Sequence, residues 1–437
     1  RSFSKDSPWN VWKFNCLKGP QGAALYGSDG VNGVIVVNTK KGSANEKFRV
    51  SINSSVDISD IAYLPQKQLR YGQGWDGFHS NFENGSWGPE FDGTLQPVGL
   101  PQADGSYIMA PYSPIKDNYK DFFQKGTIFQ NGINFSGGSL ESGYLVFGAN
   151  RVTNDFVVDG DELKRNSFLL KAGKQLGKWR IEGNFNYISE RENTADSGLY
   201  DDLLQTASNI PVSQFSHALN QHHWNIYYLS PYWRQRNQRA TSSSNYFAGI
   251  ADIGYQINKN INVSYLANIR LSDSHGESYH NGYEDTIFTI YGNRSNSELS
   301  NFFASTISDR RFYGDLKFSF DYDLTEDLDF NLIVGNNIQD RSYARNQVGG
   351  TNLEIPGLYN YSNVLNPSPA SALNNLIQRN RKVGFFANLD LGYKDYLFLN
   401  ATARQDYSSV FYDKTKGFFY PSVGISFIPT KAFENIK

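Results

Sequence analysis

The chain has 437 residues, of which 19% are charged and 15% aromatic, and it carries one cysteine and a formal net charge of −2. This balance, with no dense Lys/Arg tract, argues against nucleic-acid binding, and Cys16 alone cannot form an internal disulfide. No apolar run approaches the roughly 18 residues of a helical membrane span, whereas a mean hydropathy of −0.52 is compatible with a membrane barrel, whose strands alternate apolar and polar residues.

A glycine-rich segment runs from Lys18 to Gly42 near the start of the chain. Its glycines at positions 27, 30 and 33 suit tight turns that need a positive φ. The run from Gly33 to Thr39 is apolar and β-branched, which predicts a short buried strand. A phosphate-binding loop is the rival interpretation, but the spacing is not G-x-G-x-x-G and no strand-loop-helix context follows.

From residue 47 onward the sequence shows strands of period 2. In the segment from Trp179 to Tyr187, odd positions are apolar or glycine and even positions are polar. One such face suits lipid and the other suits a water-filled or plugged lumen. A soluble β-sandwich also alternates, but its strands are shorter and its aromatics do not gather at strand ends. The predicted strands are 48–58, 129–137, 143–153, 165–173, 178–189, 245–256, 260–271, 311–322, 328–339, 382–394, 396–405 and 419–428.

The links between these strands alternate in length. The short links are 137–142, 174–177, 258–259, 323–327 and 394–395. The longer links are 59–128, 154–164, 190–244, 272–310, 340–381 and 406–418. Strict alternation is typical of a transmembrane barrel with short periplasmic turns and long extracellular loops. We therefore expect every long link to lie outside the cell.

The glycine-rich segment resembles the closing motif of the plug domain in TonB-dependent outer-membrane transporters. Its Leu-Tyr-Gly-Ser, Asn-Gly-Val and Thr-Lys-Lys-Gly elements are similar to the SusC branch (SusC/RagA family). The plug-motif residues are Lys18, Gly19, Pro20, Tyr26, Gly27 and Gly33. Further resemblances to SusC-type loops and strands lie at 84–89, 92–93, 134–138, 230–233, 401–409 and 420–423.

This resemblance implies an all-β fold: a transmembrane antiparallel β-barrel preceded by the C-terminal end of a plug. About twelve of the roughly 22 strands expected of a plugged barrel are visible. Residues 1–46 are expected to be the C-terminal part of the plug, and residues 47–437 the N-terminal half of the barrel with its long extracellular loops. About twelve strands would close only a small barrel with no room for a plug. We therefore expect an open arc in which strands 48–58 and 419–428 do not pair.

The resemblance also implies a function. We expect TonB-coupled import of oligosaccharides or peptides through the outer membrane of a Gram-negative bacterium of the Bacteroidota type. The implied partners are a SusD-like lipoprotein lid, the surrounding lipid, and the TonB-ExbB-ExbD complex, which would act through an N-terminal segment outside this sequence. No cofactor is implied. The alternative is an architectural or receptor barrel in a surface complex, without import of its own.

Catalytic and metal sites are not expected. No G-x-S-x-G elbow is present, and the neighbouring His222 and His223 would point apart in a strand or loop, which disfavours chelation. The acidic pairs at 201–202 and 326–327 are interpreted as solvated loop or turn residues rather than a general acid and base. An outer-membrane barrel enzyme would need a catalytic dyad facing the outer leaflet, and the sequence offers none.

Aromatic residues in the long loops are the candidates for contact with substrate or lid. Their faces suit stacking on sugar rings or gripping a peptide backbone, or else they pack the loops together or form an interfacial girdle. The candidates are Trp75, Trp87, Tyr227, Tyr232 and Trp233. Two polar groups are expected on the lumen face, where they would bind the plug, trapped water or substrate. They are Glu182, Asn184 and Asn186, and Asp315, Lys317 and Asp321.

Overall fold

The computed structural model describes residues 11–17, 30, 32–39, 48–101, 104–217, 225–289, 292–412 and 417–433. The strands are β1 (Val11–Leu17), β2 (Val34–Thr39), β3 (Arg49–Ser59), β4 (Gly74–Trp75), β5 (Phe78–His79), β6 (Leu95–Val98), β7 (Ile108–Pro111), β8 (Gly126–Ser139), β9 (Gly143–Asp155), β10 (Glu162–Leu176), β11 (Trp179–Ala195), β12 (Gln238–Asn258), β13 (Ile261–His280), β14 (Tyr283–Thr289), β15 (Gly292–Glu298), β16 (Asn301–Thr325), β17 (Leu328–Leu353), β18 (Val364–Pro367), β19 (Leu376–Tyr393), β20 (Leu397–Ser408) and β21 (Phe418–Phe427). The α-helices are α2 (Gly198–Leu204), α3 (Pro231–Asn237) and α4 (Pro429–Ala432), and the 3₁₀ turns are η3 (Lys120–Phe122), η4 (Val212–His217), η5 (Tyr361–Asn363) and η6 (Ala370–Ala372).

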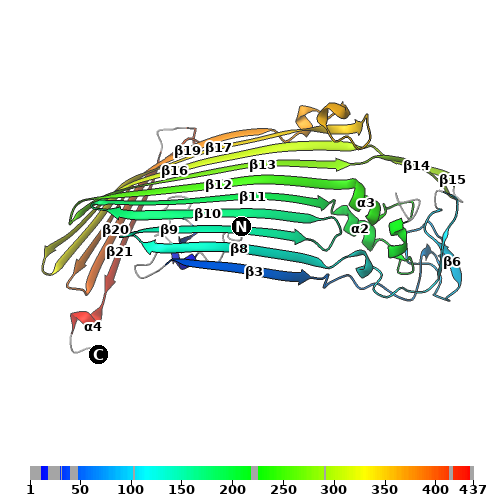
Figure 1. Cartoon of the computed structure of the whole chain (residues 1–437), viewed down its shortest axis with the longest axis horizontal. Coiled ribbons are helices and arrows are strands. Elements are labelled where there is room, and N and C mark those ends of the chain that lie inside the picture. The colour runs from blue at the N-terminus through cyan, green and yellow to red at the C-terminus, as the bar shows by residue number, and fades with distance from the viewer. Residues whose placement is uncertain are drawn as a thin grey trace.

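One large antiparallel sheet dominates the molecule. Its strands follow the order β3-β8-β9-β10-β11-β12-β13-β16-β17-β19-β20-β21, and β18 adds to β17 as the thirteenth. Each of these strands except β18 corresponds to one of the twelve predicted segments, in the predicted sequence of neighbours. Figure 1 shows that the sheet is strongly curved and that its hydrogen-bonded strands lie next to one another. The predicted antiparallel barrel sheet is therefore confirmed.

The two edges of this sheet do not meet in the described part of the chain. There, β3 pairs with β8 alone and β21 with β20 alone. All residues of β3 are exposed, and nearly all those of β21. The sheet is thus an open arc. This was expected, because a closed barrel of about twelve strands has too small a lumen to hold a plug.

The ends of the sheet differ in their connections. The short turns lie at 140–142, 177–178, 259–260, 326–327 and 394–396, all at one end. In the last of these turns, Lys394 and Asp395 both have positive φ, at 49° and 56°, which matches the twist of a two-residue hairpin turn. The long links emerge at the opposite end, where Figure 1 shows α2, α3 and β6 gathered beyond the strand ends.

Several strands continue well beyond their predicted ends. The segments 311–322 and 328–339 belong to strands of 25 and 26 residues, and β13 extends to His280. Apart from residues 323–325 of β16, these added residues lie at the long-loop end. Both faces of the extensions carry many polar residues, so the period-2 signal weakens although the backbone pairing continues.

The two faces of the sheet have opposite character. Large, exposed apolar side chains point outward from its central strands; examples are Phe168, Phe185, Ile253, Ile269 and Phe318. Buried polar side chains lie on the inner face, which is concave; these include Lys171, Glu182, Asp315, Asn337 and Arg404. This arrangement is the one that lipid outside and a polar lumen inside require.

The main apolar core lies in the loops rather than in the sheet. Its buried members are Tyr119, Phe122, Val158, Leu199, Leu203, Ala207, Ile210, Val212 and Phe215. These residues come from the links that follow β3, β9 and β11, so the loops have a core of their own. In the described ranges, no helix is long and apolar enough to cross a membrane.

Candidate functional site: the docked loops and the inner face of the sheet

The plug motif is described only at its end. Gly33 has a φ of 93°, and its N–H donates to the Gly30 carbonyl at 3.0 Å, so the glycine supplies the positive φ that the turn needs. The following strand, β2, pairs with β1, a partner that the sequence did not predict. Ile35 is 53% exposed, so the expected burial is wrong for this residue, because a two-stranded sheet cannot cover both of its faces. Lys18, Gly19, Pro20, Tyr26 and Gly27 lie outside the described residues, and their plug role stays a prediction.

The first loop (residues 60–125) and the third loop (residues 196–237) are docked on each other. The buried Asn118 side chain donates to the Ile210 carbonyl at 2.7 Å and accepts from the Val212 N–H at 3.0 Å. The Gln73 N–H donates to the side-chain oxygen of Asn209 at 2.7 Å. Buried polar groups held in this way are costly to separate, because they would lose their hydrogen bonds away from water. We call the two segments the docked loops.

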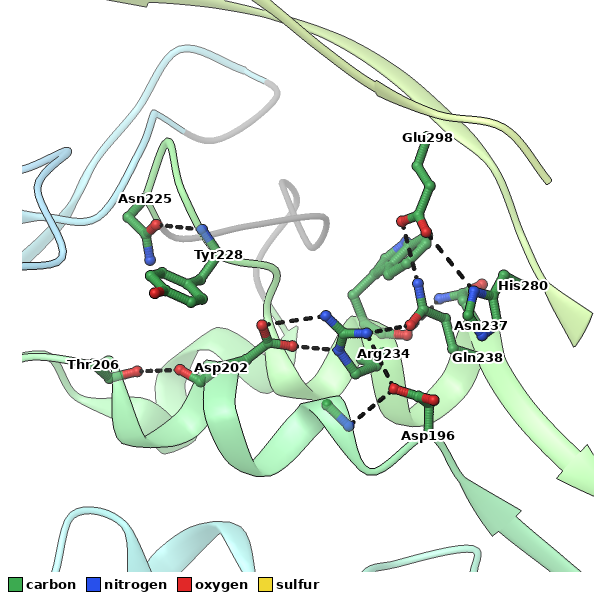
Figure 2. Close-up of polar contacts among 12 residues, drawn as sticks. Asp196, Asp202, Thr206, Asn225, Tyr228, Arg234, Asn237, Gln238, His280 and Glu298 are labelled. Atoms are coloured by element: carbon green, nitrogen blue, oxygen red, sulfur yellow. Dashed lines mark hydrogen bonds and ion pairs between the residues drawn. The ribbon is translucent and has the colours of Figure 1, made fainter. Parts of the chain in front are cut away.

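An arginine at the centre of the third loop joins its two helices (Figure 2). Arg234 on α3 donates through Nε and Nη2 to the two carboxylate oxygens of Asp202 on α2. Its Nη1 donates to Asp196 Oδ1 at 3.2 Å and to Gln238 Oε1 at 2.6 Å. The Gln238 amide then donates to Glu298 Oε2, on β15, at 3.2 Å. A chain of polar contacts thus links the third loop to the β14–β15 hairpin.

Asp202 was predicted to be a solvated loop acid, and this prediction is wrong. Only 2% of this residue is exposed, because the Leu199 and Leu203 side chains of the same short helix pack into the loop core. Burial raises the pKa of Asp202, and the Arg234 guanidinium acts against that rise. The sequence offered one usable signal for this arrangement, the pair Ser230-Pro231, since proline favours the first turn of a helix and α3 begins there.

Three of the predicted contact aromatics are accessible. Trp75 is 57% exposed and Trp87 60% exposed, both on the first loop. Tyr227 is 48% exposed, and its hydroxyl donates to Glu83 Oε1 at 3.3 Å. The exposed rings at the loop end of the barrel sheet have faces available for stacking against a ligand or a protein surface.

The other two predicted aromatics pack inside the loops. Tyr232 lies against Phe122 with ring centroids 4.9 Å apart, and Trp233 is only 5% exposed, with its ring 5.1 Å from that of Tyr283. Both rings belong to α3, which lies against the loop core. The expectation of ligand contact is therefore corrected for Trp233, whose ring is covered by protein, and the packing interpretation applies to it.

Of the predicted polar residues of the inner face, Glu182, Asp315 and Lys317 take part in ion pairs. Arg180 contacts Glu182 Oε1 at 2.5 Å and Asp252 Oδ1 at 2.9 Å, across β11 and β12. Lys317 contacts Asp315 Oδ2 at 2.7 Å. These charges lie on the polar inner side of the sheet, where each has an opposite charge within hydrogen-bond distance.

The described residues were expected to lack a metal centre, and the arrangement of their possible ligands bears on that expectation. Across them, no group of three or more His, Cys, Asp or Glu side chains is placed to hold a metal ion. His222 and His223 lie outside the described ranges.

No protein-family model matches the chain. Among curated proteins, it is 23% identical over 459 residues to TonB-dependent receptor P3 of Formosa agariphila. It is 21% identical over 448 residues to TonB-dependent receptor SusC of Bacteroides thetaiotaomicron. The alignments cover 97% and 96% of this chain but 40% of each relative. The chain thus spans about two fifths of the length of these curated relatives.

Solved structures give the same picture of the fold. The RagAB peptide importer in its "open-open" state has a TM-score of 0.73 at 16% identity, covering 97% of this chain and 48% of that one. The "closed-closed" state gives 0.72 at 15% identity, covering 99% and 50%. These structures support the barrel architecture, while both curated relatives are TonB-dependent receptors that match nearly the whole chain. Over nearly its whole length, the chain is thus similar in sequence to TonB-dependent receptors, SusC among them.

Proposed function

We propose that the intact protein imports oligosaccharides or peptides across the outer membrane of a Gram-negative bacterium, in a TonB-coupled process. The observation that carries this proposal is the sheet itself. It has an apolar outer face, a polar inner face and all its long loops at one end, which suits a plugged membrane barrel open to the outside. The curated relatives, both TonB-dependent receptors, support the energy coupling.

Residues 1–46 are proposed to end the plug, and residues 47–437 to form the first half of the barrel. The separation of the β1–β2 sheet from the large sheet supports this division. TonB, with ExbB and ExbD, would act on the plug and release the substrate inward.

A SusD-like surface lipoprotein is the proposed lid. The docked loops support this role, since they are held by buried amides and an apolar core and present exposed tryptophans beyond the sheet. A preorganised surface with exposed rings loses little conformational freedom when a partner binds. The similarity in fold to RagAB, a peptide importer, makes peptides as well as glycans candidate substrates.

The test is uptake by cells that carry or lack the gene for the full-length protein. Uptake of labelled oligosaccharides or oligopeptides should require this gene and stop when TonB is deleted. Import that persists without TonB would contradict the coupling. A lipoprotein that co-purifies with the barrel in cells without gene-dependent uptake of either class would favour the alternative, an architectural or receptor barrel.

A further inference from the structure

Three arginines form one row across the inner face of the sheet. Arg270 on β13 lies opposite Arg311 on β16, and Arg311 lies opposite Arg341 on β17. Directly opposed residues share a face, so the three side chains extend to the same side. Strand alternation places them on the side of the buried Asp315, away from the exposed Ile269. Like charges in opposed positions destabilise a sheet, so this row has a structural cost.

The arginines outnumber the acids around them. On the inner face of β13, β16 and β17, four successive cross-strand rows run from the row of Asn268 to the row of Ser274, and they carry four arginines and one carboxylate. Their twelve residues are Asn268, Arg270, Ser272, Ser274, Ile307, Asp309, Arg311, Tyr313, Gln339, Arg341, Tyr343 and Arg345. The single carboxylate, Asp309, accepts from Arg311 at 2.6 Å and from Arg341 at 2.9 Å. Among the described residues, Arg270 has no acidic partner, and the Nε of Arg345 is buried without a hydrogen bond.

The guanidinium groups remain accessible. The side chain of Arg311 is 50% exposed and that of Arg341 is 38% exposed. Tyrosine rings lie among them: the Arg341 guanidinium is 5.3 Å from the centre of the Tyr343 ring. The inner face here therefore offers cationic donors beside aromatic rings, a combination that suits a sugar carrying acidic groups.

The row lies at the outer mouth of the lumen. On the opposite face of the same strands, the row through Ala267, Gly314 and Ile338 is apolar. Four residues further toward the long loops, the outer face carries Arg310 and Arg379, on either side of Ser342. The change from apolar to charged residues marks the outer limit of the lipid-facing band, and the arginine row is at this level.

We propose that Arg270, Arg311, Arg341 and Arg345 form a recognition strip for an anionic oligosaccharide, bearing carboxylate or sulfate groups, at the entrance of the lumen. Guanidinium groups bind such oxyanions through paired hydrogen bonds. Neighbouring strands are about 5 Å apart, so the strip suits an oligomer with closely spaced acidic groups rather than a single small anion. This inference rests on the proposed import function and specifies its substrate class.

The test uses the full-length protein purified in detergent. Its binding would be measured with oligogalacturonides as the carboxylate probe, chondroitin sulfate oligosaccharides as the sulfate probe, and maltooligosaccharides of equal length as the neutral probe. The double variant Arg311→Gln with Arg341→Gln should weaken binding of an anionic sugar about tenfold or more, since hydrogen bonds to charged groups are individually strong. The variant should also flatten the dependence of that binding on salt.

The matched control is Arg310→Gln with Arg379→Gln, which removes two arginines from the outer face of the same strands. This control should bind the anionic probes as the wild type does. Heat-modifiable mobility in electrophoresis checks that each barrel has assembled. If the inner double variant does not assemble, the single Arg270→Gln variant tests the same idea without leaving a carboxylate unpaired.

Four outcomes would overturn the inference. Anionic sugars could bind no better than neutral ones, or the inner and outer variants could lose equal binding affinity for them. The inner variants could merely make the barrel leaky by loosening a plug, or an oligoglutamate peptide could bind through these arginines more tightly than the sugars. The proposed function fails separately. TonB-independent uptake would contradict it while leaving arginine-dependent binding intact, whereas TonB-dependent uptake of neutral glycans alone would contradict only the recognition strip.

Discussion

Arg234 on α3 and Asp202 on α2 form a two-point contact in which Nη2 lies 3.3 Å from Oδ1 and Nε donates to Oδ2. The carboxylate is almost completely buried, and the same guanidinium reaches Asp196 and Gln238. The two short helices are too small to be stable by themselves in water. Their position on the barrel therefore depends on this contact and on the apolar core beneath it.

Replacing the buried acid should loosen the third loop without affecting barrel assembly. Asp202→Asn leaves the Arg234 charge without its main partner, and breaking a buried pair costs roughly 3–5 kcal/mol. Limited proteolysis and amide exchange of residues 196–237 should both accelerate, while heat-modifiable mobility of the full-length protein stays unchanged.

The control for that variant is Glu90→Gln. It removes one partner of the Arg70–Glu90 pair, whose side chains are 70% and 58% exposed. Exposed pairs contribute little, so loop protection should stay at the wild-type level. Equal loosening in both variants would mean that net charge, rather than the buried contact, holds the loop.

The loop tryptophans should divide into two groups. Trp75→Ala and Trp87→Ala should weaken capture of lid or substrate while the loops stay protected, because both rings are exposed. Trp233→Ala should instead destabilise the third loop by roughly 3–5 kcal/mol, as expected for a buried aromatic side chain. Binding assays and amide exchange on the same variants separate the two effects. Normal capture in the Trp75/Trp87 double variant would contradict their proposed role.

The sequence predicted the strands better than the loops. All twelve barrel strands were found because an apolar lipid-facing side alternates with a polar side over their whole membrane depth. The signal ends where both sides meet water, which is why β16 begins at Asn301 rather than near 311. The hairpin from Tyr283 to Glu298 was missed for the same reason.

The candidate site could be predicted only in part. The exposure of Trp75 and Trp87 followed from their position in a long polar loop. The burial of Trp233 depends on how α3 packs against distant segments, and no local pattern encodes that. The alignment of Arg270 with Arg311 depends on strand register, which is fixed by turn geometry and by pairing along the whole strand.

Mild acid should loosen the first loop through His79. Its pKa is lowered from 6.5 because the ring is buried, and a hydrogen bond to the Pro97 carbonyl only partly opposes this. The buried Nε2 has no hydrogen-bond partner, so the folded loop favours the neutral ring. The stabilisation is therefore fully present above about pH 6.5 and is lost as the pH falls below that value. The neighbouring Tyr112, whose pKa burial raises to about 12, stays protonated throughout.

Amide exchange of residues 60–125 at pH 7.5 and pH 5.5, corrected for the intrinsic exchange rate, measures this effect. His79→Phe keeps a ring against Tyr112, which lies 5.3 Å away in an edge-on arrangement, but it cannot take up a proton. Exchange in this variant should not depend on pH. Acid loosening of the same size in His79→Phe would assign the effect to another group.

Gly33→Val should disturb the turn before β2. The φ of 93° at this position is strained for a β-branched residue, at a cost of roughly 1–2 kcal/mol. If this turn seats a plug, cells that carry the variant should become more sensitive to large antibiotics such as vancomycin. Gly105→Val is the matched control: Gly105 has a φ of 81° and open space around its Cβ position, but it lies in the first loop. Unchanged impermeability in Gly33→Val would count against the plug assignment.

The edges of the sheet should be paired in the full-length protein. In lipid, each unpaired N–H or C=O of β3 and β21 would cost several kcal/mol, and four apolar side chains of β3, at positions 50, 52, 56 and 58, are exposed on one face. Amide exchange in the full-length protein should therefore be as slow in β3 and β21 as in the central strand β11. Residues 1–437 expressed alone should give no heat-modifiable barrel, because their arc leaves two free edges. Fast exchange at both edges of the full-length protein, or a heat-modifiable barrel from residues 1–437, would show that this sheet needs no further strands.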